Sequence, residues 1–150
     1  MKVMTRISGF LIFSLLGLTL ASRSLVSAEV PPVQDEMEAP SKLMVLWTSG
    51  DREVALKMVF MYTFNAKKRG WWDEVRFVVW GPSSKLLSED KELQKGIKDM
   101  IEAGVEIQAC KACADMYGVS DELAALGVDI KYMGVPLTDM LKGGWISLTF

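Results

Sequence analysis

The two cysteines, Cys110 and Cys113, are the residues of this chain best suited to covalent chemistry. They follow the β-branched, apolar stretch 105–109, which is typical of a buried strand. The residues after them have the composition of a short helix that ends at Gly118. The pattern therefore predicts that Cys110 lies where a strand ends and a helix begins.

A thiol at the start of a helix is predicted to be reactive. Unpaired N–H groups and the helix dipole favour an anion there, so the thiol pKa falls, and Lys111 adds a positive charge nearby. Cys113 lies one turn further along, and we expect its sulfur to be more buried and its thiol to be less acidic. Cys110 is therefore the predicted nucleophile, with Cys113 as its companion.

The spacing of the cysteines leaves other chemistries open. A C-x-x-C pair permits a reversible dithiol–disulfide couple. A structural disulfide that closes so short a loop gains little chain entropy, and zinc needs four ligands where this chain has two cysteines. The absence of histidine excludes Ser-His-Asp catalysis, Cys-His catalysis and histidine-ligated metals. A single reactive thiol, a redox dithiol and an inert pair remain as interpretations, and no cofactor or metal is expected.

The rest of the pattern alternates between strands and helices. Strands are predicted at 42–48, 74–80, 105–109, 128–133 and 145–150. Helices are predicted at 52–69, within 83–103, after the cysteines, at 121–126 and at 136–142, with Asp51, Ser88 and Ser120 as N-terminal caps. Such alternation predicts an α/β fold with three layers (α/β/α) and a five-stranded, mainly parallel sheet.

The helix predicted at 52–69 is apolar on nearly every side. A helix that covers one face of a sheet needs only one apolar stripe. We therefore expect a second buried face against another subunit, which predicts a homo-oligomer. Phe60 is the residue we choose as outward-facing.

The N-terminus has the order of a secretory signal peptide. Basic Lys2 and Arg6 precede an apolar core over 9–20, and Val26-Ser27-Ala28 resembles a cleavage site. We expect cleavage after Ala28 and a periplasmic or secreted protein. Residues 1–28 are then the signal peptide, 29–41 an acidic tether that contains proline, and 42–150 the folded domain.

The charge of the predicted mature chain argues against nucleic acid as a partner. Removing residues 1–28 takes away three basic residues and no acid, so the formal net charge falls from −2 to −5. An acidic domain lacks the basic patch that nucleic-acid binding needs. No membrane association is expected after cleavage.

Several motifs resemble the DsrE/DsrF-like (YchN-type) family. They are "KLMVLWTSG" from residue 42, the second strand running into Gly81-Pro82-Ser83, "GVEIQACKACADMYGV" (104–119) and the C-terminal strand–helix–strand. The resemblance covers 42–150. It implies a three-layer α/β/α fold, assembly into trimers or hexamers and, in some members, sulfur relay through a cysteine persulfide. The family's acceptor cysteine falls on Cys110.

The leading functional hypothesis is an exported DsrE-like sulfur carrier, or sulfurtransferase, that forms a persulfide at Cys110. Cys113 could resolve that persulfide by forming a disulfide and releasing sulfide. A donor or acceptor protein, or a small sulfane-sulfur compound, is the expected partner. The alternatives are a periplasmic dithiol–disulfide oxidoreductase that uses Cys110 and Cys113, and a non-enzymatic oligomeric binding module.

Overall fold

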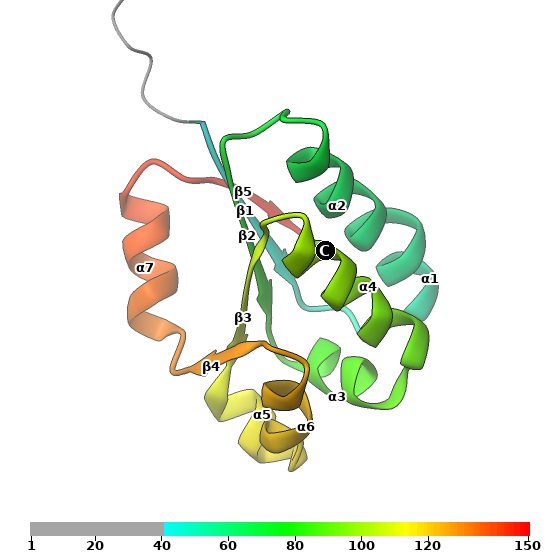
Figure 1. Ribbon diagram of the computed structural model, residues 1–150. Coiled ribbons are helices and arrows are strands. Elements are labelled where there is room, and N and C mark those ends of the chain that lie inside the picture. Colours follow the sequence, from blue (N-terminus) through cyan, green and yellow to red (C-terminus); the bar gives the residue numbers. More distant parts are fainter. Residues whose placement is uncertain (1–40) are drawn as a thin grey trace, which may run out of the picture. The chain divides into compact units, whose positions relative to one another are not determined.

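The computed structural model describes residues 41–150 (Figure 1). The predicted signal peptide and the tether up to residue 40 lie outside these residues. Across 41–150, no helix combines the length and apolarity that crossing a membrane requires. The described part includes residues 42–150, the stretch predicted to be the folded domain.

Five strands form one sheet in which every neighbouring pair is parallel, in the order β4-β3-β2-β1-β5. The strands are β1 (Lys42–Trp47), β2 (Glu74–Val79), β3 (Glu106–Cys110), β4 (Asp129–Lys131) and β5 (Ile146–Thr149). The central strands β1 and β2 are rich in valine, leucine and phenylalanine because both of their faces are covered. The α/β class and the parallel sheet are confirmed.

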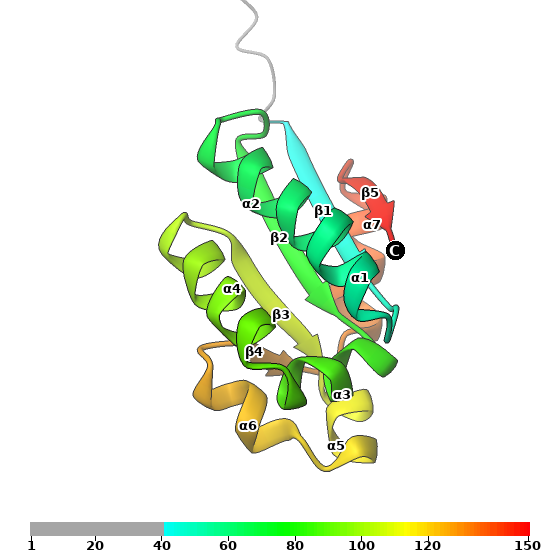
Figure 2. The ribbon, with the colours of Figure 1, turned by 90° about the vertical axis from the view of Figure 1, so that its right-hand side faces the viewer.

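The helices are distributed unequally over the two faces of the sheet. They are α1 (Arg52–Val54), the π-helical turn η1 (Ala55–Phe60), α2 (Met61–Lys68), α3 (Pro82–Glu89), α4 (Lys91–Glu102), α5 (Lys111–Tyr117), α6 (Ser120–Ala125) and α7 (Gly134–Lys142). The continuous helix α1–η1–α2 and α4 cover one face, called here the first face (Figure 2). α7 covers the second face, and α3, α5 and α6 lie toward the carboxyl end of the sheet (Figure 1).

Chain topology explains this distribution. The chain moves from β1 to β4 in one direction across the sheet, and right-handed crossovers in one direction place their helices on one face. The last crossover returns from β4 to the far side of β1, which reverses the direction. α7 therefore lies on the opposite face from the other crossover helices.

The first face carries the larger core, which is centred on three aromatic rings. The centroid of Trp47 lies 5.3 Å from that of Phe60 and 5.9 Å from that of Phe77, and the last two are 5.5 Å apart. Phe60 is only 7% exposed, so its prediction as an outward residue is wrong. Met58 and Met61, which are 52% and 58% exposed, lie on the outer surface of this helix.

The segment between β2 and β3 also differs from its prediction. Residues 83–103 were expected to hold one helix capped by Ser88, but two helices, α3 and α4, meet at Asp90. The Asp90 carboxylate accepts hydrogen bonds from the N–H groups of Glu92 and Leu93, and so caps α4. The Ser88 hydroxyl instead donates to a backbone carbonyl of α3. Ser120 is likewise the first residue of α6 rather than its cap.

The second face carries a smaller cluster that positions the cysteines. Its buried members are Met44, Val78, Cys110, Met133 and Met140. Met44, Val78 and Cys110 lie on strands of the sheet. Met133 lies just before α7, and Met140 lies in its last turn. Cys113 and Trp145 pack against the cluster and are partly exposed.

Candidate functional site: two thiols at the carboxyl edge of the sheet

Cys110 occupies the junction of strand and helix that the sequence predicts. It is the last residue of β3 and the N-cap of α5, with φ −71° and ψ 109°. Its side chain belongs to the second-face cluster and is 5% exposed. The thiol is free, as is that of Cys113. The structure therefore holds the two cysteines as unpaired thiols.

Cys113 lies beside Cys110 and is more exposed than its companion. Partial burial raises the pKa of the Cys113 thiol above its usual value, and the neighbouring Cys110 side chain raises it further. The Gly81 backbone opposes that shift in the pKa of Cys113. The expected difference in acidity between Cys113 and Cys110 stays a prediction.

Three details of the expected environment of Cys110 are wrong. Cys110 is the more buried thiol because it still belongs to the strand, on the face covered by α7. Its sulfur makes no capping hydrogen bond to the N–H groups of α5. The Lys111 ammonium, expected to act on the thiol, pairs instead with Asp115 at 2.7 Å, one turn along the same helix.

The loop after β2 contributes to the surroundings of Cys113. Gly81 has φ 74° and ψ −134°, a conformation that residues with a Cβ rarely adopt. The buried Ser83 hydroxyl accepts from the Trp80 N–H at 3.0 Å and donates to the Trp47 carbonyl at 2.7 Å. Ser83 thus ties the ends of β1 and β2 together and fixes the backbone that reaches Cys113.

The remaining side of the site is the end of β4. Cys110 is the register partner of Lys131, so the two side chains leave the same face of the sheet. β3 leads into α5, whose Ala114 packs in the first-face core, whereas β4 leads into α7 on the second face. Adjacent strands whose exits diverge in this way form a crevice, and ligand sites of parallel α/β proteins occur there.

Sequence reasoning found both thiols but missed Gly81 and Lys131. Neither has a local signal of function, because a glycine after a strand and a lysine at the end of another are common. Their proximity depends on strand order and register, which one sequence does not reveal. Among residues 41–150, no group of three or more histidine, cysteine, aspartate or glutamate side chains could hold a metal ion.

The fold and the site define a class: an α/β protein that holds two unpaired cysteines at the diverging end of a five-stranded parallel sheet. The chain belongs to the DsrE/DsrF-like family, whose model matches residues 42–150. Among curated proteins, none matches the sequence.

Solved structures share this fold. A conserved protein of unknown function from Bacteroides thetaiotaomicron is 38% identical, with a TM-score of 0.71 over 73% of this chain and 95% of that one. The YchN protein of E. coli is 17% identical, with a TM-score of 0.58 over 75% of this chain and 100% of its own. A protein of unknown function from Methanobacterium thermoautotrophicum is 21% identical, with a TM-score of 0.59 over 73% and 100%. The last two likenesses concern the fold alone.

Proposed function

We propose that this protein carries sulfane sulfur as a persulfide on Cys110, with Cys113 as the resolving thiol. The observation that carries the proposal is the contact between two free thiols, of which the Cys113 thiol has a raised pKa. Membership of the DsrE/DsrF-like family agrees with sulfur relay. The raised pKa of Cys113 favours its protonated form, which suits a resolving thiol that acts after loading.

Loading is a transfer between thiols without net oxidation. The Cys110 thiolate attacks the outer sulfur of a donor persulfide, R–S–SH. A new S–S bond forms to Cys110 while the donor S–S bond breaks, and R–S⁻ leaves with the electron pair. The thiolate is the nucleophile in such exchanges, and a neighbouring S–H from Cys113 stabilises it by hydrogen bonding.

Release uses the second cysteine. The Cys113 thiol loses its proton and attacks the inner sulfur of the Cys110 persulfide. The Cys110–Cys113 disulfide forms and hydrosulfide leaves with the electrons of the broken bond. An external dithiol reductant then restores both thiols. An acceptor protein thiol that attacks the outer sulfur instead would receive that sulfur directly and leave Cys110 as a thiolate.

Polysulfide loading of single-cysteine variants tests this function. The reduced Cys113→Ser variant should gain one sulfur atom in mass, and alkylated peptides should place that sulfur on Cys110. The matched Cys110→Ser variant should gain none. The wild type should release hydrosulfide and form the internal disulfide. Loading of Cys113 alone, or no loading of either variant, would contradict the proposal.

A dithiol–disulfide oxidoreductase is the second candidate, and the same contact between the thiols favours it. It requires a reversible Cys110–Cys113 couple in glutathione redox buffers. If the wild type cycles between dithiol and disulfide while neither single variant takes up sulfur, this candidate replaces the carrier. If both cysteines can be replaced without loss of a cellular phenotype, a binding module remains.

We further propose that the protein works outside the cytoplasm after cleavage of residues 1–28. The proposal rests on the basic, apolar and small-residue order of that segment. N-terminal sequencing of protein from the native host should then begin at Glu29. A full-length protein in the cytoplasmic fraction would refute it.

A further inference from the structure

A cavity of about 370 Å³ lies on the second face, between the sheet and α7. Its size falls within the roughly 300–1,000 Å³ typical of small-molecule sites. The side chains that matter here come from three strands and from α7 and the residues after it: Arg76, Gln108, Lys131, Asp139, Met140 and Trp145. The cavity therefore has an apolar wall and several polar groups of both signs.

Gln108 is the residue that points to a ligand. Its side chain lines the cavity and is only 7% exposed, yet its Oε1 accepts no hydrogen bond from any described residue. A buried acceptor without a donor destabilises a protein by about 1–3 kcal/mol, so such atoms are rare and usually have a partner. A hydrogen-bond donor placed within the cavity would satisfy this oxygen.

The charges around the cavity favour a ligand with both signs. Arg76 and Lys131 contribute cations, and Asp139 contributes a carboxylate. Arg76 pairs through Nε with Glu106, and Lys131 pairs with Asp129. Together with Asp139, these side chains make three acids and two bases. That balance disfavours a small polyanion. A zwitterion can place its carboxylate at the cations and its ammonium at the acceptors.

Arg76 is well placed to hold a carboxylate. Its guanidinium lies 4.6 Å from the ring centroid of Trp145, which fixes the plane of the group. A guanidinium has five N–H donors, and the pair with Glu106 uses the Nε–H. The terminal nitrogens remain to donate in parallel to a ligand carboxylate.

The cavity adjoins the thiol site. Gln108 and Cys110 are two residues apart on β3, so their side chains leave the same face about 6.6 Å apart along the strand. Lys131 lines the cavity and is also the register partner of Cys110. A ligand that fills the cavity can therefore extend a short side chain toward the Cys110 sulfur.

We propose that this cavity binds a small zwitterionic thiol, of the amino-acid type, whose persulfide is the sulfur donor to Cys110. Its ammonium group donates to Gln108 Oε1 and pairs with Asp139, and its carboxylate binds Arg76 and Lys131. The role as donor rests on the proposed function, whereas the binding itself does not. In the transfer, the Cys110 thiolate takes the outer sulfur of the bound persulfide, and the bound thiol leaves as its thiolate.

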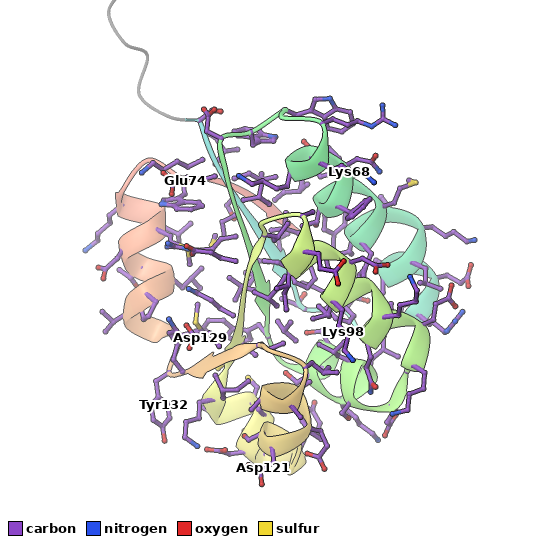
Figure 3. All side chains as sticks on the ribbon, in the orientation of Figure 1. Lys68, Glu74, Lys98, Asp121, Asp129 and Tyr132 are labelled. Atoms are coloured by element: carbon purple, nitrogen blue, oxygen red, sulfur yellow. The ribbon has the colours of Figure 1, made fainter. Side chains whose placement is uncertain are left out.

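Calorimetric titration with S-methyl-L-cysteine tests the binding without any sulfur transfer, because its sulfur is blocked. We expect the reduced wild type to bind it. Gln108→Met should bind about 10- to 100-fold more weakly, since a hydrogen bond to a charged group is lost. Asp139→Asn changes an exposed residue, so it should fold normally and also weaken binding. The matched control is Lys98→Met. Lys98 lies on α4, which covers the first face, and it does not line the cavity, so this variant should bind like the wild type (Figure 3).

A ligand series separates the two ends of the molecule. 3-(Methylthio)propanoate lacks the ammonium group, so it should bind the wild type weakly and be insensitive to Gln108→Met. Absence of S-methyl-L-cysteine binding to the wild type, or equal affinity in Gln108→Met, would overturn the proposal. Polysulfide does not need this cavity, so loading of Cys110 in Gln108→Met reports on the proposed function separately.

Discussion

Replacing Gly96 with alanine sets two effects of opposite sign against each other. Gly96 lies in the interior of α4, where a glycine is about 1 kcal/mol less favourable than an alanine. Considered as an isolated helix, Gly96→Ala should therefore stabilise the protein. The new methyl group, however, would lie 2.7 Å from Phe60 Cδ1 and 3.0 Å from Cε1. Carbon atoms that close repel strongly.

The ring of Phe60 has little room to move away. It packs edge-on against both Trp47 and Phe77, with centroids 5.3 Å and 5.5 Å distant. Inserting a carbon atom into a packed core destabilises by about 1–3 kcal/mol. The clash should therefore exceed the gain in helix propensity. We expect the free energy of unfolding of Gly96→Ala to fall by about 1 kcal/mol.

Urea unfolding followed by circular dichroism measures this change. The control is the same substitution in a Phe60→Ala background, where no side-chain atom lies beyond Cβ. There Gly96→Ala should raise the free energy of unfolding relative to Phe60→Ala alone. A Gly96→Ala protein about 1 kcal/mol more stable than the wild type would show that helix propensity outweighs the packing, and would refute the reasoning.

Three further results are expected from the same structure. If the exposed surface of the helix around Met58 joins subunits, Met58→Glu should lower the mass measured by light scattering without unfolding the subunit. Phe60→Asp should instead unfold the subunit, because Phe60 is buried. An unchanged mass for Met58→Glu would show that this surface is not the interface. Hydrogen bonds from the Leu93 N–H and from Arg52 lower the pKa of Asp90. The stability that Asp90 contributes is therefore present at neutral pH and is lost as the pH falls through its folded-state pKa. In urea unfolding at a series of acidic pH values, Asp90→Asn should make the free energy of unfolding depend less on pH. Replacing Cys110 with alanine removes one cause of the raised pKa of Cys113, so the pH midpoint for alkylation of Cys113 should fall. It should stay above the usual value for a cysteine, because the burial of Cys113 remains. An unchanged midpoint would show that Cys110 does not influence Cys113.

Local features of the sequence were sufficient to predict much of the fold. The apolar stretch at the start of the domain became β1, with a difference of one residue at its end. Asp51 caps the first helix as predicted, since its carboxylate accepts from the N–H groups of Glu53 and Val54. Strand–helix alternation sufficed for the parallel sheet, because parallel neighbours require crossovers.

The errors arose where the outcome depends on non-local geometry. The π-helical turn η1 adds a residue to one turn, which rotates the following side chains by about 100° relative to a regular α-helix. The sequence does not reveal this turn and could not fix which residues of the helix face the sheet, so the choice of Phe60 as outward-facing was wrong. Gly96, whose missing side chain makes room for Phe60, gives no sign of that role in the sequence.

At the candidate site too, residue types could be predicted from the sequence, whereas burial and pairing could not. Cysteine is a rare and reactive residue, so both thiols could be identified from residue type and spacing. Their relative burial could not, because it depends on α7, which crosses to the second face only through the reversal after β4. The function inferred for Gln108 depends on an unpaired atom, and pairing is a property of the folded chain.

The strand order has a consequence for the sheet during synthesis. β1 is central in the finished fold, between β2 and β5, yet it is the first strand to leave the ribosome and β5 is the last. Until β5 has been made, one edge of "KLMVLW" has unpaired backbone groups, and its apolar side chains lack their final cover. Contacts between such distant segments form slowly, and exposed apolar edges favour aggregation. We therefore expect a chaperone that binds β1 until β5 has been synthesised to reduce aggregation of the nascent chain.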